Sequence, residues 1–176
     1  MRKWLFSFLV ISSALICRAQ DAADQRSHND LLQWYSSVAQ AYDLSKSSGK
    51  PIFAFFTGSD WCGWCHKLQR DVFAKPAFVE WADKNVVLLE LDFPRKKTLT
   101  PELAQQNNQL QQVFRVGAFP TIWMFCIDKD EAAKKMNISA LGSLGYPPSV
   151  ELGKEEVSFL TNANRILASC KKSNQP

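Results

Sequence analysis

The feature that most constrains how this sequence folds is a pair of cysteines, Cys62 and Cys65, placed shortly after a buried-strand pattern. Residues 52–56 form an unbroken apolar run, which is typical of a β-strand covered on both faces of a sheet. Residues 57–61 make a short loop, and a helix is predicted to begin near Cys62 and to run towards residue 72. Two thiols are therefore expected where a helix leaves the end of a buried strand.

The rest of the chain predicts alternating strands and helices, with no internal repeat. Helices are expected where apolar residues recur at helical spacing, and strands where apolar runs are short. The expected helices cover residues 30–45, 62–72, 76–84, a stretch from Thr100 that Gly117 stops, and 155–169; the expected strands cover 52–56, 86–91, 121–127 and 138–146. This order indicates an α/β fold with helices on both faces of a central sheet.

The first 19 residues have the pattern of a secretory signal peptide, with a basic start, an apolar stretch and a small residue, Ala19, at the expected cut. The apolar stretch is shorter than the ~20 residues that a membrane-spanning helix needs. Lipid attachment at Cys17 and an uncleaved anchor are the alternatives, and the bulky Ile16 before Cys17 disfavours lipidation. We therefore expect a periplasmic or secreted protein.

Cleavage of the signal peptide changes the composition of the chain. Removal of 19 of the 176 residues leaves a polar lead over residues 20–29, one domain over 30–172 and a tail over 173–176. Three basic residues leave with the signal peptide, so the formal net charge falls from +4 to +1, and no basic surface argues for nucleic acid binding. Four cysteines remain: Cys62, Cys65, Cys126 and Cys170.

The position of Cys62 at a helix start favours redox chemistry. Free N–H groups and the positive end of the helix dipole would stabilise its thiolate, which is the reactive form of cysteine. Cys65, one turn into the helix, is expected to be more buried and to react second. Trp61 would shield the site and offer a flat apolar surface to a partner.

A second motif, Phe119-Pro120-Thr121, directly precedes an apolar strand. Proline cannot donate to a strand ladder. A cis Phe119–Pro120 peptide bond would let the chain turn tightly against the Cys62 loop. It would also leave backbone groups free to pair with an extended substrate peptide.

Taken together, these residues resemble the thioredoxin superfamily over about residues 50–170. The resemblance rests on the strand 52–56, the Trp61-Cys-Gly-Trp-Cys65 segment, the Leu91-Asp92 strand end and Phe119-Pro-Thr121. The leading helix and the loop 58–61 look closer to secreted members than to cytosolic ones. The resemblance implies a thioredoxin-like fold, with a central mixed sheet of about four to five strands flanked by helices on both faces.

The resemblance also implies an activity, a protein-disulfide oxidoreductase that reduces protein disulfides or keeps proteins reduced and needs no metal or organic cofactor. Cys62 would be the nucleophile and Cys65 the resolving thiol, and the two would form the active-site disulfide. Electrons would come from a membrane thiol carrier, and we expect a monomer. The implied substrate groove consists of Trp61, Gly63, Trp64, Phe119, Pro120 and Thr121.

The sequence departs from the thioredoxin pattern at the proton relay. Phe56 stands where thioredoxin has a buried aspartate, and the partner lysine falls near Leu88. Glu90, two residues from Leu88 on the same strand face, is a possible substitute, or else a solvated acid near a loop. Trp64 stands where thioredoxin has proline, which affects the reduction potential.

The same residues also match, in part, the patterns of other functions. Zinc would need four ligands, usually from a second paired motif, which the chain lacks. Cys62-x-x-Cys65-His66 matches the haem c attachment pattern, but the preceding strand and the Phe-Pro-Thr motif have no role in a cytochrome. A dithiol oxidase, a disulfide isomerase and a binding or chaperone module with inert cysteines remain as alternatives.

The remaining reactive residues have two interpretations each. His66 lies one turn from Cys62, so it could modulate the thiolate or be an exposed polar residue. Cys126 is expected in the core, and a Cys126–Cys170 disulfide is an alternative. His28 lies in the polar lead, and Trp34, Trp81 and Trp123 are expected in the core.

Overall fold

The computed structural model describes residues 32–130, 135–148, 151 and 153–173. The predicted signal peptide, the polar lead and residues 174–176 lie outside the described residues, as do Cys17 and His28. Among the helices of the described part, none is long and apolar enough to cross a membrane.

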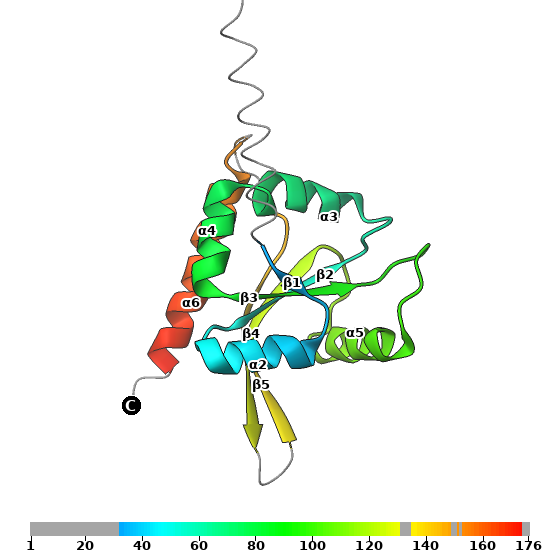
Figure 1. Ribbon diagram of the computed structural model, residues 1–176. Coiled ribbons are helices and arrows are strands. Elements are labelled where there is room, and N and C mark those ends of the chain that lie inside the picture. The colour runs from blue at the N-terminus through cyan, green and yellow to red at the C-terminus, as the bar shows by residue number, and fades with distance from the viewer. Residues whose placement is uncertain (1–31, 131–134, 149–150, 152, 174–176) are drawn as a thin grey trace, which may run out of the picture.

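A five-stranded mixed sheet forms the centre of the molecule, in the order β1-β3-β2-β4-β5 (Figure 1). Strands β1, β3 and β2 run parallel, and β4 and β5 are antiparallel to their neighbours. The strands are β1 (Trp34–Tyr35), β2 (Ile52–Thr57), β3 (Val87–Asp92), β4 (Thr121–Asp130) and β5 (Lys135–Leu144). The predicted α/β fold with a mixed sheet is confirmed.

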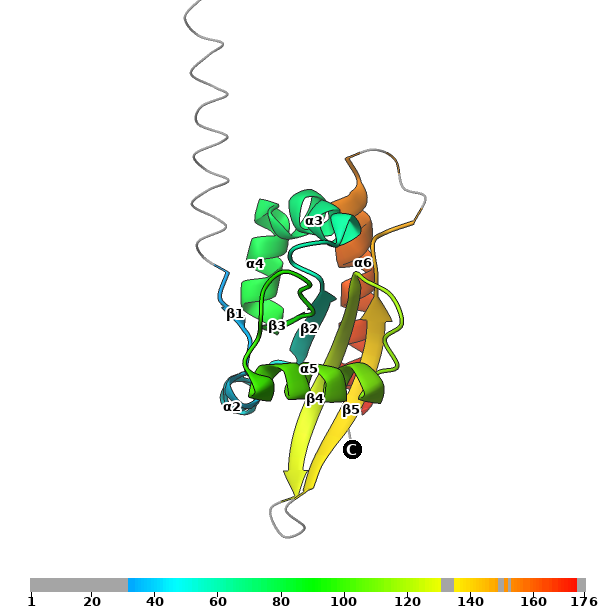
Figure 2. The same ribbon diagram turned by 90° about the vertical axis from the view of Figure 1, so that its right-hand side faces the viewer.

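Helices cover both faces of this sheet (Figure 2). One face packs against α3 (Gly63–Leu68), the π-helical turn η1 (Gln69–Phe73), α4 (Pro76–Asn85) and α6 (Glu155–Ser173). The other face packs against α2 (Val38–Ser48) and α5 (Pro101–Val113). The central strand β2 is buried along its whole length, as its continuous apolar run predicts.

The alternation of side chains along β2 divides the core into two layers. Phe53 and Phe55 point towards α3, η1, α4 and α6, where they join a cluster that also contains Cys62 and Cys65. Phe56 points the other way, into the layer beneath α2 and α5. The cysteine pair is therefore built onto one specific face of the sheet.

The helix predicted over residues 30–45 is corrected by the structure. Trp34 and Tyr35 form the short strand β1 and pair in parallel with Leu88 and Leu89 of β3. The helix α2 begins only at Val38, because the side chain of Ser37 caps it by accepting the N–H of Gln40. The apolar residues whose spacing predicted one helix therefore lie in two elements, the edge strand β1 and the helix α2.

The end of the helix that begins at Thr100 is also corrected. Thr100 caps it as expected, by accepting the N–H of Leu103, but α5 ends at Val113 and not at Gly117. The chain reverses at Arg115, which takes a left-handed conformation with φ of 51°. Gly117 lies beyond this turn, in the segment that leads to Pro120.

Candidate active site

Cys62 and Cys65 form a disulfide at the start of α3, close to the end of β2 from which the chain enters this helix (Figure 1). The S–S distance is 2.08 Å, and the two Cα atoms are 5.2 Å apart. Cys62 is the N-cap residue, and its Sγ accepts the backbone N–H of Cys65 at 3.2 Å. Cys62 is 5% exposed and Cys65 is 0% exposed, so the predicted order of burial is confirmed.

Trp61 forms one wall beside the disulfide. Its indole Nε1 donates to the carbonyl oxygen of Phe93 at 2.8 Å, and its ring centre lies 5.8 Å from that of Phe119. The guanidinium carbon of Arg95 lies 3.8 Å from the centre of the indole, in cation–π contact. The indole also packs against Gly58, where any Cβ would come within 2.4 Å of it.

The Phe119-Pro120-Thr121 motif lies against this wall. The Phe119–Pro120 peptide bond is cis, and Thr121 Oγ1 donates to the carbonyl of Ala118 at 2.7 Å. Phe119 stacks on Phe93 with ring centres 5.1 Å apart and contacts Trp61. The two motifs that lie far apart in the sequence are thus brought together through their aromatic side chains.

Of the two tryptophans beside the cysteines, Trp64 is the more exposed: 59% of its surface is exposed, against 37% for Trp61. Its ring packs edge-on against Tyr146, with centres 5.2 Å apart. Tyr146 donates to Asp71 Oδ2 at 2.9 Å, and the ammonium group of Lys67 bonds to both side chains. The Lys67 hydrogen bond lowers the pKa of Asp71, and the same bond raises the pKa of Lys67.

His66 and Glu90, the two predicted modulators, occupy different environments. His66 is exposed, and its Nε2 lies 2.9 Å from the carbonyl oxygen of Ser59, which places the ring in a hydrogen bond with the loop before Cys62. Glu90 is half-buried on β3, opposite Phe55 on the sheet face that carries the disulfide. Burial raises the pKa of its carboxyl, Asp92 raises it further, and Lys97 opposes the shift. Among the described residues, no hydrogen bond joins Glu90 to either cysteine.

Two acids that the sequence reasoning passed over shape the loop before Cys62. Asp92 accepts the N–H of Ser59 at 2.8 Å and its hydroxyl at 2.6 Å. Asp60 accepts backbone N–H groups from three consecutive residues after β3, and these bonds lower the pKa of its carboxyl, that of Arg95 most. Among the contacts around the disulfide that the sequence did not predict, only the Lys67–Asp71 ion pair has a local signal, because the two residues are four positions apart.

The other predicted residues lie away from the disulfide or beyond description. Cys126 is half-buried on β4, and Cys170 lies in α6 with its side chain outside the described part. Trp81 is buried, and its Nε1 donates to Asn164 at 2.8 Å; Trp34 and Trp123 are half-buried. Within the described ranges, no group of three or more His, Cys, Asp or Glu side chains is placed to hold a metal ion.

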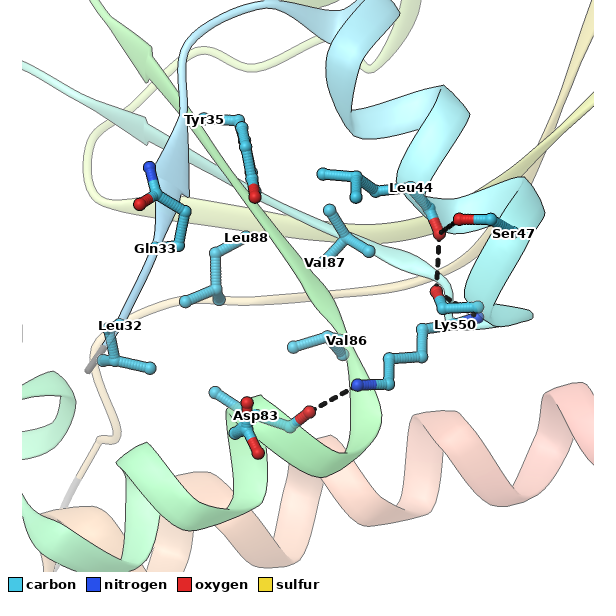
Figure 3. A pocket seen from close by; sticks show the side chains of 12 residues that line it. Leu32, Gln33, Tyr35, Leu44, Ser47, Lys50, Asp83, Val86, Val87 and Leu88 are labelled. Carbon is cyan, nitrogen blue, oxygen red and sulfur yellow. Dashed lines mark hydrogen bonds between the residues drawn. The ribbon is translucent and has the colours of Figure 1, made fainter.

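A shallow pocket at the far end of the sheet is separate from this site. It lies where β2 and β3 begin (Figure 3), whereas the disulfide follows the end of β2. Leu44, Val86 and Val87 form apolar parts of its wall, and Lys50 Nζ donates to the carbonyl oxygen of Asp83 at 2.5 Å across its rim. Nothing in its lining is reactive towards disulfides.

Comparison with known proteins gives a consistent result. Residues 33–126 match the model of a family described as thioredoxin-like. The chain is 35% identical over 120 residues to "Disulfide bond reductase DsbH" of Chlamydia pneumoniae, which covers 68% of this chain and 71% of that protein. It is 26% identical over 133 residues to "Thioredoxin-related protein DsbJ" of the same organism, covering 76% of this chain and 36% of that protein.

A solved structure shows the same likeness in three dimensions. The structure titled "DsbH Oxidoreductase" superposes with a TM-score of 0.63 at 31% sequence identity, covering 78% of this chain and 85% of that chain. The likeness extends well beyond the segment around Cys62 and includes most of the sheet and its helices.

Proposed function

This chain belongs to the thioredoxin-like family and is a protein-disulfide oxidoreductase, and from that premise we propose that it reduces protein disulfides through Cys62 and Cys65. Cys62 is the nucleophile in this proposal, and Cys65 is the resolving thiol. The relative named as a disulfide bond reductase supports the reducing direction.

The observation that carries the assignment is the N-cap position of Cys62. Its Sγ accepts the N–H of Cys65 at 3.2 Å, and a thiolate at this position keeps that donor and gains from the helix dipole. Cys65 has no exposed surface. An incoming disulfide therefore meets Cys62 first, and Cys65 reacts from inside the fold.

The reaction proceeds by two thiol–disulfide exchanges. The Cys62 thiolate attacks one sulfur of the substrate disulfide; a Cys62–substrate bond forms, the substrate S–S bond breaks, and the released sulfur takes up a proton. The Cys65 thiolate then attacks Cys62 Sγ, which forms the Cys62–Cys65 bond and releases the second substrate thiolate. The second substrate thiolate also takes up a proton. Two electrons therefore pass from the protein dithiol to the substrate, and the two protons lost by the protein thiols balance the two that the substrate sulfurs take up.

We propose that the substrate lies along a groove formed by Trp61, Gly63, Trp64, Phe119, Pro120 and Thr121. The side chains of Trp61 and Trp64, which flank Cys62 in the sequence, are exposed, and the contact between Trp61 and Phe119 supports including the proline segment. An extended peptide could pair with the backbone there, as it does in strand addition.

The cellular setting is proposed from the sequence and from the names of the relatives. The chain would carry a cleaved signal peptide over residues 1–19, followed by the polar lead 20–29, the domain 30–172 and the tail, and would act in the periplasm or outside the cell. The oxidised Cys62–Cys65 pair must be reduced again by a second dithiol. A membrane thiol carrier is the proposed donor.

An insulin reduction assay with two cysteine variants tests this proposal. Cys62→Ser should abolish the activity, whereas Cys65→Ser should still attack and accumulate a mixed disulfide that mass spectrometry detects. Unchanged insulin reduction by Cys62→Ser would contradict the site assignment. Equilibration with glutathione tests the direction, because a potential near about −120 mV is that of a strong oxidant and would favour the dithiol oxidase alternative.

A further inference from the structure

A basic loop borders the disulfide, on the side where Trp61 lies. We infer that this loop, residues 93–97, selects disulfides that are flanked by acidic residues. The inference rests on the proposed role of Cys62 as nucleophile. The loop leaves the end of β3 and lies beside the start of α3 in both views (Figures 1 and 2).

The loop is fixed to the segment that carries the cysteines. Asp60, two residues before Cys62, accepts the backbone N–H groups of Arg95 at 2.9 Å, Lys96 at 2.7 Å and Lys97 at 3.1 Å. Because these bonds involve the backbone, they leave the side chains of Lys96 and Lys97 available to other partners, while Arg95 contacts the Trp61 ring. The position of the charges relative to Cys62 is therefore set by the fold.

Aromatic contacts fix the loop a second time. Trp61 Nε1 donates to the carbonyl of Phe93 at 2.8 Å, and Phe93 stacks on Phe119 with ring centres 5.1 Å apart. The Arg95 guanidinium lies over the Trp61 ring. The loop thus contacts Trp61 and Phe119, which belong to the two motifs of the proposed groove.

The charges of the loop are open to a ligand. Arg95, Lys96 and Lys97 are exposed, and among the described residues their side chains form no ion pair. The carboxylate of Asp60 accepts hydrogen bonds from the loop backbone, so one negative charge faces the three cations. On the Trp64 side, Lys67 and Arg70 both pair with Asp71. The exposed cations that belong to no ion pair among the described residues near the site are therefore those of the loop.

This asymmetry fits a polypeptide substrate with acidic residues on one side of its disulfide. The Debye length is about 8 Å at physiological ionic strength, so the loop charges act with little screening on the part of an incoming peptide that passes within that distance. Complementary charge raises association rates by roughly 10-fold to 1,000-fold. We assign this preference for acidic substrates to the loop and not to the overall charge of the chain, because the formal net charge is +4 and falls to +1 when residues 1–19 are removed.

The test compares three synthetic disulfide peptides that share one ring and carry Glu, Gln or Lys at the flanking positions. The purified, reduced protein is mixed with each peptide, and the second-order rate is measured by acid quench, alkylation and chromatography. The test variant is Lys96→Glu with Lys97→Glu, which keeps the backbone bonds to Asp60. The control is Lys46→Glu with Lys84→Glu, which makes the same charge change at the last turns of α2 and α4, and Cys62→Ser gives the background.

For the unaltered protein we expect the Glu peptide to react about 10-fold faster than the Lys peptide at low ionic strength, with a smaller ratio in high salt. The loop variant should level or reverse this order, and the control should keep it. Rates equal within about twofold for all three peptides, or a preference that survives in the loop variant, would overturn the inference while leaving the reductase proposal intact. Rates no higher than those of Cys62→Ser would refute the proposed function and this inference with it.

Discussion

At Gly58, the addition of a single methyl group is predicted to disturb the active site. A Cβ at this residue would lie 2.4 Å from Cε2 and Nε1 of Trp61, a distance that real Cβ contacts do not reach. Gly58→Ala must therefore move the indole, because β2 is buried immediately before this residue. Gly63→Ala is the matched control, because a Cβ at Gly63 meets nothing within 4 Å.

The magnitude follows from the contacts that a displaced indole loses. The hydrogen bond to Phe93 contributes about 1 kcal/mol, the ring contact with Phe119 about 0.5–1.5 kcal/mol and the exposed cation–π contact with Arg95 about 0.5–1 kcal/mol. Gly58→Ala should therefore lower the free energy of unfolding by about 2–3.5 kcal/mol. Gly63→Ala should leave it unchanged or raise it by up to about 1 kcal/mol, because alanine restricts the unfolded chain.

Urea unfolding of the oxidised protein, followed by circular dichroism, measures both free energies. Tryptophan fluorescence reports the position of the indole, and the insulin assay reports the site. Equal stabilities and equal fluorescence for the two alanine variants would refute the inference that Gly58 makes room for Trp61.

Two further predictions concern the pH dependence of stability. Burial raises the pKa of Glu90 in the folded protein, so its charged form opposes folding once the pH rises above the usual value of 4.5. Glu90→Gln should therefore be more stable than the parent at neutral pH and equally stable in acid. A variant that is less stable than the parent at neutral pH would contradict this. The pKa of Asp71 is lowered by Lys67, so Asp71→Asn should be less stable at neutral pH, with a difference that shrinks as the pH falls below 3.8. Urea unfolding across this pH range measures both, and a difference for Asp71→Asn that persists undiminished in acid would exclude the ion pair with Lys67 as its cause.

Patterns within a few residues of one another were sufficient to predict four of the five strands, β2 to β5, and the position of Cys62 at a helix start. The apolar run of β2 predicts a strand buried on both faces, and the Cys62 spacing predicts a thiol at a helix start. The same periodicity failed over residues 30–45. The side chains of Trp34 and Tyr35 are compatible with a helix or with a strand. They form a strand here because their backbone pairs with the edge of β3.

The surroundings of the disulfide depend on contacts between residues that are distant in the sequence. Asp60 and the loop after β3 are 35 residues apart, and Lys67 and Tyr146 are 79 residues apart. Contacts between residues so far apart cannot be predicted from local sequence patterns. The close approach of Trp61 to Gly58 is likewise a property of the folded turn, because it depends on where the indole is held by Phe93.

The contacts of Asp60 and Asp92 change how the missing relay should be understood. Both acids lie near the disulfide, but their oxygens accept hydrogen bonds from the loops on either side of it, and Asp60 is held in its charged form by those bonds. An acid that must exchange a proton with a thiol needs a pKa closer to neutrality. Glu90 has a raised pKa and lies on the sheet face that carries the cysteines, whereas Phe56 occupies the opposite layer. Glu90 therefore stays the proposed relay acid, whereas Asp60 holds the backbone of the basic loop and Asp92 holds Ser59.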